Sequence, residues 1–235
     1  MSAWSTEWFA AAGATAVRRT LAWRGVEAQH VVSTLRLVDD PDEQALLEQL
    51  LDDSKPALPA AAQGLHYLLA TPFRYAPAHA SRFRAAHAKG QWYGAETLFA
   101  AGAEVAYWRH RFVSDSEGLR DRELLTEHSF FQGQIEGPSI DLSAPPWHQA
   151  RADWTQDSDY SATHAVATAA QARGLQWLRY ESVRAPGQFC AVALLPQCLR
   201  EPPGGLDGTL QTWHCKATRQ RVMLTRGRER WAWDF

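Results

Sequence analysis

The sequence predicts an α+β fold in which helices flank a central, mostly antiparallel sheet. Helical periodicity occurs before residue 60 and again after residues 95 and 161, and short apolar segments joined by turn-prone residues fill the last third of the chain. With 235 residues, the chain is long enough to bury a core. We expect an N-terminal helical extension, residues 1–60, followed by one larger domain, residues 61–235.

The first sixty residues are predicted to be helical. In DPDEQALLEQLLDDSKP, Asp40 suits an N-cap and Pro41 suits the first helical position. Four leucines make one apolar face: Leu46, Leu47, Leu50 and Leu51. The pair Lys55-Pro56 ends this helix, and LPAAAQG then marks a boundary. The next segment, HYLLATPFRY, is apolar and aromatic enough to be predicted as a strand.

A second helix is predicted from Ala95 onward. Thr97, Ala101, Glu104 and Trp108 follow one another at spacings of four, three and four, so they share one helix face. A carboxylate on a packing face is costly unless it is hydrogen-bonded or serves a ligand. Residues 114–159 are more polar and are predicted to mix strands with loops.

A third helix is predicted to start at Ser161 or Thr163 and to stop at Gly174. LQWLRYESVR and FCAVALLP then predict a strand pair joined through the turn-prone residues 185–187. The C-terminal tail alternates in polarity, which predicts two more strands around Arg226-Gly227.

Charge and cysteine content exclude several classes of function. The chain has 24 Lys+Arg against 26 Asp+Glu, so it lacks the positive field that holds nucleic acid or an anionic membrane. Its three cysteines form no CxxC pair, and its histidines show no metal-ligand spacing. The N-terminus lacks the order of a secretory signal, and no window reaches the ~18 apolar residues of a membrane span. We expect a soluble, cytoplasmic protein without metal.

The segment Thr71 to Arg109 carries the residues with the clearest chemistry. Arg82, Tyr93 and Glu104 are spaced 11 residues apart. A guanidinium can hold a pyrophosphate, an aromatic ring can stack on a planar group, and a carboxylate can stabilise a cationic sugar carbon.

Together with Ser182 in YESVR, these residues resemble the RES-domain family, and the resemblance extends from about Gln63 to Leu195. It implies an ADP-ribosyltransferase-like fold with a split, mostly antiparallel sheet, and residues 61–235 as the RES domain. It also implies an activity that consumes NAD+ as the substrate, with no further cofactor. Members are mostly toxins of bacterial toxin–antitoxin pairs, so the implied partner is an Xre-like antitoxin with a helix-turn-helix DNA-binding part.

The catalytic residues implied by this resemblance are Glu104, Arg82 and Ser182. Glu104 would face the anomeric carbon or bind the ribose hydroxyls, and Ser182 would donate a hydrogen bond to the substrate. Arg74 and Arg82 would clamp the pyrophosphate and ribose. Arg84 remains an alternative to Arg82, because an alternating strand would place both on the same side.

Four further residues are candidates for NAD+ binding. The ring of Tyr93 could stack on nicotinamide, or its hydroxyl could bond a phosphate. Tyr75 is a second aromatic candidate beside Arg74. Tyr160 and His164 occupy a helix start that the family places near the site, where either could touch ribose or phosphate.

Three functions stay open at this stage. The leading one is a toxin that cleaves the nicotinamide–ribose bond with water or phosphate as acceptor. The second is ADP-ribosyl transfer to a protein, and the third is a non-enzymatic interaction module. The residues before 60 could cover a sheet edge or build a homodimer.

Overall fold

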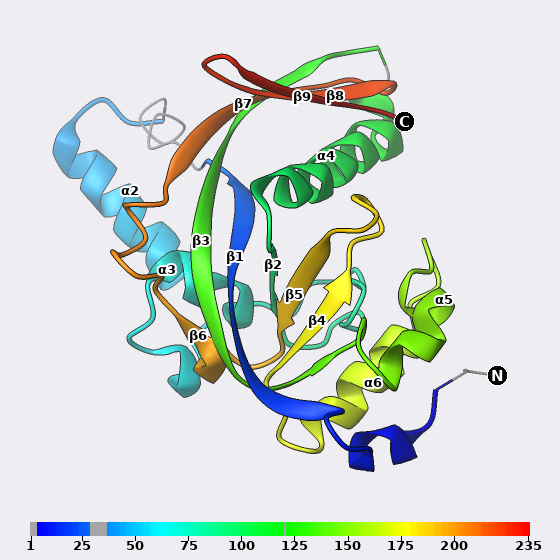
Figure 1. Ribbon diagram of the computed structural model, residues 1–235. Helices are drawn as coiled ribbons and strands as arrows, with labels where there is room; N and C mark the ends of the chain where they lie inside the picture. Colours follow the sequence, from blue (N-terminus) through cyan, green and yellow to red (C-terminus); the bar gives the residue numbers. More distant parts are fainter. Residues whose placement is uncertain (1–3, 29–36, 120) are drawn as a thin grey trace.

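The computed structural model describes residues 4–28, 37–119 and 121–235, in which helices surround one nine-stranded sheet (Figure 1). The strand order is β1-β2-β5-β4-β3-β7-β8-β9, with β6 paired to β3 and β1 also paired to β3. Within the described ranges, every strand pair is antiparallel except β3–β4, which confirms the predicted mostly antiparallel sheet. The strands are β1 Thr15–Glu27, β2 Trp92–Ala95, β3 Leu124–Asp141, β4 Trp177–Glu181, β5 Phe189–Ala193, β6 Leu199–Arg200, β7 Gln211–Ala217, β8 Arg221–Arg226 and β9 Glu229–Asp234.

The sheet divides along β3. One edge of β3 pairs with β1 from Thr15↔Ile140 to Glu27↔His128, and the two strands curve together through the molecule (Figure 1). The other edge of β3 is shared in succession by β7, β6 and β4. Because β1 also pairs with β2, the strands β1, β2, β5, β4 and β3 close a ring, while β7, β8 and β9 extend away from it.

The predicted helical extension is correct in one part and wrong in another. Helix α2, Pro41–Asp53, starts as expected, with the Asp40 carboxylate accepting hydrogen bonds from the backbone N–H groups of Asp42 and Glu43. Thr15–Glu27, however, is the strand β1 and belongs to the main sheet. Its threonines and valines favour a strand, and pairing with β3 outweighs the helical tendency of its alanines and arginines. Residues 1–3 and 29–36 lie outside the described residues.

The strand predicted for HYLLATPFRY is also wrong. This segment forms the short helix α3, Tyr67–Ala70, followed by the 3-10 helix η3, Thr71–Arg74. Nδ1 of His66 accepts from the backbone N–H of Leu68 at 3.3 Å and so caps α3. Pro72 lies in the first turn of η3, where its fixed φ and missing N–H are tolerated.

The two later helices form where the sequence predicts them. The first is α4, Leu98–Asp115, and the Thr97 hydroxyl caps it by accepting from the backbone N–H of Ala100. The second is α6, Ser161–Gln171, which is followed by Gly174 with a φ of 74°. The remaining short helices are η1 Thr6–Ala10, η2 Ala60–Ala62, η4 Glu117–Leu119, η5 Trp147–Ala150, α5 Arg151–Trp154 and η6 Pro196–Cys198. None of the helices in the described ranges is long and apolar enough to cross a membrane.

The strands predicted after residue 175 are confirmed. β4 and β5 are antiparallel, and the tail contains β8 and β9 around Arg226-Gly227. The tail also supplies β7, which was not predicted as a separate strand. β3 lies in the segment that was expected to mix strands with loops.

Helix α4 packs closely between β1 and the C-terminal strands. On the β1 side, a Cβ at Gly25 would lie 2.7 Å from Val105 Cγ2, so only glycine allows this approach. On the other side, Gly102 lies under Trp231 and Trp233. The Trp231 ring in turn stacks on Trp213 at 4.3 Å. The sheet therefore holds α4 in a fixed position.

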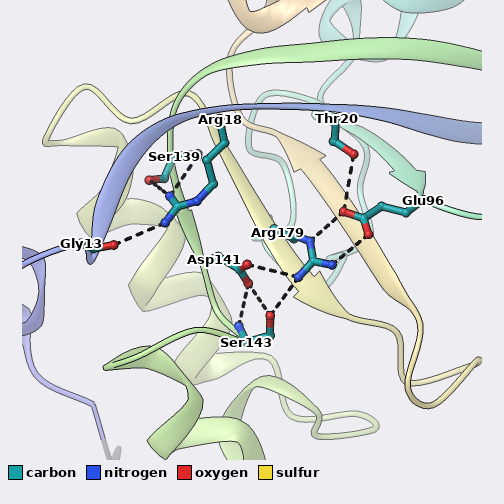
Figure 2. A network of polar contacts seen from close by, with 8 residues as sticks. All are labelled: Gly13, Arg18, Thr20, Glu96, Ser139, Asp141, Ser143 and Arg179. Carbon is teal, nitrogen blue, oxygen red and sulfur yellow. Dashed lines mark hydrogen bonds and ion pairs between the residues drawn. The ribbon is translucent and has the colours of Figure 1, made fainter.

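Arg179 on β4 joins several strands through a polar network (Figure 2). Its guanidinium donates to both carboxylate oxygens of Glu96 at 2.7 and 2.9 Å, and to Asp141 at 3.1 Å and Ser143 at 3.0 Å. The Thr20 hydroxyl on β1 reaches Glu96 at 3.5 Å. The guanidinium of Arg179 on β4 thus joins Asp141 on β3 to Glu96 after β2, and Glu96 in turn contacts Thr20 on β1.

Replacing this cation should destabilise the fold. Arg179→Gln leaves two carboxylates without their partner, and we expect the free energy of unfolding to fall by about 2–3 kcal/mol. The matched control is Arg221→Gln, which removes an exposed pair with Asp234 and should lower the free energy of unfolding far less. Urea denaturation of both variants measures the difference, and equal losses would contradict the role given to Arg179.

Candidate functional site

A cavity of about 620 Å³ lies between α4, β1, β2 and the loops near residues 81 and 184. Several sequence-predicted site residues line it, namely Arg82, Tyr93, Glu104 and Tyr160. Its other lining side chains include Trp23, Glu27, Tyr107, Trp108, Arg109, Phe112, His128, Tyr180, Arg184 and Cys190. The cavity therefore combines a carboxylate, several guanidinium groups and many aromatic rings.

Glu104 comes from the middle of α4, and Ser182 fixes its orientation. The Ser182 hydroxyl donates to Oε1 of Glu104 at 3.0 Å. Oγ of Ser182 in turn accepts hydrogen bonds from the backbone N–H groups of Arg184 at 3.2 Å and Ala185 at 3.0 Å. Ser182 is only 1% exposed and does not line the cavity. It therefore positions Glu104, whereas the sequence predicted that it would donate to the substrate.

The environment of Glu104 works against its charge. Burial raises the pKa of the Glu104 carboxyl above its ordinary value. The hydrogen bond from Ser182 and the charges of Arg184 and Arg82 lower this pKa but do not cancel the effect of burial. The ionised carboxylate is thus held in a site where it lacks full solvation, and a developing positive charge nearby would be strongly favoured.

Arg82 reaches the cavity from a short loop that α6 holds in place. Its Nη1 donates to the carbonyl oxygens of Trp154 at 3.1 Å and Gln156 at 2.8 Å, and its guanidinium lies 5.1 Å from the Tyr160 ring. No partner of Nη2 or Nε occurs within the described residues. These donors are available to an anionic ligand.

Two side chains of α6 hold the backbone of this loop. The Thr163 hydroxyl donates to the carbonyl of Arg82, and Nε2 of His164 donates to the carbonyl of Ser81 at 2.8 Å. His164 does not line the cavity. Its structural role is therefore to support the loop that carries Arg82.

Arg84 does not lie on the same side as Arg82, so the expected alternating strand is wrong. Ser81 and Arg84 form an isolated bridge that closes a turn. Arg84 is only 7% exposed, and its Nη1 donates to the carbonyls of Pro77 at 3.2 Å and Ala85 at 2.9 Å. Its guanidinium thus holds its own loop together, and the structure brings Arg82 to the cavity instead.

The Tyr93 hydroxyl is already occupied by protein groups. It lies 2.9 Å from Ser81 Oγ, accepts from the backbone N–H of Phe83 at 3.1 Å and donates to Gln91 Oε1 at 2.9 Å. Burial raises the pKa of Tyr93 to about 12. The hydroxyl therefore shapes the loop, and the ring is what Tyr93 offers to the cavity.

Arg74 and Tyr75 do not line the cavity. Arg74 ends η3. The pKa of Asp52 on α2 is lowered mainly by a hydrogen bond from Lys55, and the positive charge of Arg74 adds to this effect. The Tyr75 carbonyl accepts from the backbone N–H of Gly90 at 2.8 Å. A role of these two residues in ligand binding stays a prediction.

Several lining residues were missed by sequence reasoning. Arg184 packs its guanidinium 3.4 Å from the centre of the Tyr107 ring and pairs with Asp157. It lies two residues after Ser182 in YESVR, so that motif already contained a signal. Arg109 and His128 could not be recognised from the sequence. Both lie beside Glu27 on β1, and this strand was predicted to be helical, so the three residues were not expected to be neighbours.

The titratable groups of the cavity do not suggest a metal site or a thiol nucleophile. Cys190 lines the cavity, but burial raises the pKa of its thiol, which keeps it protonated. Within the described ranges, no three His, Cys, Asp or Glu side chains are placed to hold a metal ion.

Comparisons with known proteins place the chain in a family. Among solved structures, a chain of the M. tuberculosis MbcT–MbcA toxin–antitoxin complex is similar, with 15% sequence identity, 87% of each chain covered and a TM-score of 0.47. No curated protein matches the sequence. A sequence model of the RES domain matches residues 57–215, which is more than half of the chain. The chain therefore belongs to the RES domain family.

Proposed function

We propose that this protein degrades NAD+ by cleaving the bond between nicotinamide and ribose. The observation that carries the proposal is the Glu104 carboxylate, fixed by Ser182 in a cavity that also presents Arg82 and Arg184. A carboxylate held in this way suits a reaction that creates positive charge on a sugar carbon. Family membership supports the same reading, because the sequence resembles RES proteins at these residues.

The bond breaks with its electron pair leaving on the nicotinamide nitrogen, so nicotinamide departs as a neutral molecule. The anomeric carbon and the ring oxygen then share a positive charge, which Glu104 stabilises. Water adds to this carbon with loss of a proton to give ADP-ribose, or phosphate adds to give ADP-ribose 1″-phosphate. Both acceptors are consistent with the cavity.

The other side chains of the cavity would hold the substrate. Arg82 has donors left for phosphate oxygens, and a guanidinium binds them in a bidentate manner. The rings of Tyr93 and Tyr160 provide flat surfaces for nicotinamide. Ser182 acts through Glu104 as a positioning residue.

We also propose that the protein is the toxin of a toxin–antitoxin pair and that an Xre-like antitoxin neutralises it. The support is the resemblance to RES proteins, most of which act in such pairs. An antitoxin that covers the cavity mouth would prevent NAD+ from reaching Glu104.

The direct test is incubation of the purified protein with NAD+, with and without phosphate, and separation of the products by chromatography. Release of nicotinamide supports the proposal, and the companion product identifies the acceptor. ADP-ribose attached to protein would instead indicate transfer to a protein target. Absence of nicotinamide release in both buffers would refute the proposed reaction.

Glu104→Gln should abolish activity without weakening the fold. The amide keeps the shape but loses the charge, so we expect nicotinamide release to fall at least about 100-fold. A carboxyl with a raised pKa stabilises the fold when protonated, and this contribution is lost as the pH rises through that pKa. At neutral pH the variant should therefore melt at or above the wild-type temperature.

Calorimetry and the NAD+ assay check the two parts of this expectation. Glu136→Gln, at an exposed position on β3, is the matched control. It should leave the melting temperature and the nicotinamide release unchanged. Normal activity of Glu104→Gln would rule out the catalytic role.

Arg82 and Arg84 should respond differently to the same substitution. Arg82→Lys keeps the charge but loses the bidentate geometry, so we expect the KM for NAD+ to rise about tenfold or more. Arg84→Lys should lower the melting temperature, because its guanidinium joins several carbonyls of one loop, while KM stays near the wild-type value. Steady-state kinetics and thermal melts distinguish the two variants. If Arg84→Lys raised KM and Arg82→Lys did not, Arg84 would be the residue that binds NAD+.

The pH dependence of the reaction should report on Glu104. Because the ionised carboxylate is the active form, kcat should fall as the pH drops through the raised pKa of Glu104. Ser182→Ala removes a hydrogen bond that lowers this pKa, so the acidic limb should move to higher pH. Profiles of kcat against pH for both proteins check this, and superimposable limbs would show that Ser182 does not tune Glu104.

A further inference from the structure

We propose that the end of the cavity formed by Glu27, Trp108, Arg109, Phe112 and His128 binds the adenylate half of NAD+. This inference rests on the proposed function, because it extends the binding site of the same substrate. It assigns a task to residues that the proposed reaction at Glu104 leaves unused.

The cavity is long enough to hold both halves of a dinucleotide. Glu104 and Phe112 lie on the same helix, α4, and both line the cavity. Phe112 follows Glu104 by eight positions, which at a rise of 1.5 Å per residue corresponds to about 12 Å along the helix axis. A dinucleotide whose nicotinamide ribose lies at Glu104 could therefore place its second nucleoside at Phe112.

Aromatic side chains at this end are exposed to the cavity. Trp108 is 50% exposed and Phe112 is 52% exposed, although both belong to a helix that is otherwise packed against the sheet. Large apolar side chains that line a cavity at this exposure are typical of ligand sites. A purine offers a flat face that stacks on such rings.

The polar groups of this end form one connected set. Arg109 pairs with the Glu27 carboxylate and donates from Nε to Nε2 of His128 at 3.1 Å. Since Nε2 of His128 accepts this bond, the imidazole proton is on Nδ1. Nδ1 is buried and has no hydrogen-bond partner within the described residues, and His128 is only 2% exposed. The set thus contains a buried donor that lacks an acceptor.

The adenylate half supplies groups that match this set. Adenine ring nitrogens can accept hydrogen bonds from the guanidinium of Arg109, which lines the cavity. Ribose hydroxyls can donate to Glu27, as they do to the acidic residue of dinucleotide-binding folds. Burial and the charge of Arg109 lower the pKa of His128 to about 4, so the imidazole is neutral at physiological pH.

The experiment compares NAD+ with nicotinamide mononucleotide, which contains the scissile bond but lacks the adenylate half. We expect the wild type to prefer NAD+ in kcat/KM by at least about 100-fold. Arg109→Met and Trp108→Ala should each reduce this preference at least about tenfold. Arg109→Met also removes two pairs that support the fold. Trp108 is half-exposed, so Trp108→Ala should fold normally and tests the proposal independently.

The matched control is Arg111→Met on the same helix. Arg111 pairs with Asp115 at the surface and does not line the cavity, so the preference should stay at the wild-type value. If Arg109→Met and Trp108→Ala keep the wild-type preference as well, the proposed adenylate site is wrong.

Binding of AMP separates this inference from the proposed reaction. Calorimetry should show that AMP binds wild type and Glu104→Gln alike, and at least about tenfold more weakly to Trp108→Ala. Failure of AMP to bind the wild type, or equal binding by all three proteins, would overturn the adenylate site even where NAD+ is cleaved. If neither nucleotide is cleaved but AMP binds in this pattern, the proposed reaction fails and the adenylate site stands.

Discussion

The pairing of β1 with β3 is the constraint on which the rest of the structure depends. It runs from Thr15↔Ile140 to Glu27↔His128, and it leaves the other edge of β3 free for β7, β6 and β4. Because β1 also reaches β2, this pair closes the ring of strands beside which α4 packs. Gly25 lies within the pair and allows α4 to approach, so the pair also sets the distance between Glu104 and the opposite wall of the cavity.

The site balances one partly buried carboxylate, that of Glu104, against several cations and hydrogen-bond donors. Burial disfavours the charge on Glu104, whereas Ser182, Arg184 and Arg82 favour it. These groups come from three parts of the chain. Glu104 belongs to α4, Ser182 and Arg184 to the loop after β4, and Arg82 to the loop before β2. The tertiary structure must therefore be complete before the carboxylate acquires this environment.

Local signals in the sequence predicted much of the fold. The helix after Asp40 was predicted from its cap and the helix after Thr97 from its periodicity, and both form where they were expected. The strand pair joined near Gly187 and the hairpin at Gly227 were also predictable, because turn chemistry is local. β1 was missed, since its partner is more than a hundred residues away and its alanines and arginines also suit a helix. Because β1 was not predicted as a strand, its residues that line the cavity, such as Trp23 and Glu27, were not predicted either.

The candidate site was predicted less evenly. Four of the candidate residues line one cavity, namely Arg82, Tyr93, Glu104 and Tyr160. Motif spacing could not reveal that the Ser182 hydroxyl is directed at Glu104 or that Arg84 is bonded within its own loop, because both depend on how turns close in three dimensions.

The span matched by the RES domain, residues 57–215, contains neither β1 nor the β8–β9 hairpin. A protein trimmed to that span would leave β3 with a bare edge thirteen residues long, corresponding to the missing β1. Long unpaired edges recruit strands from other molecules, so such a fragment would tend to aggregate. The smallest unit that keeps both edges of β3 paired is therefore larger than the unit that sequence similarity defines.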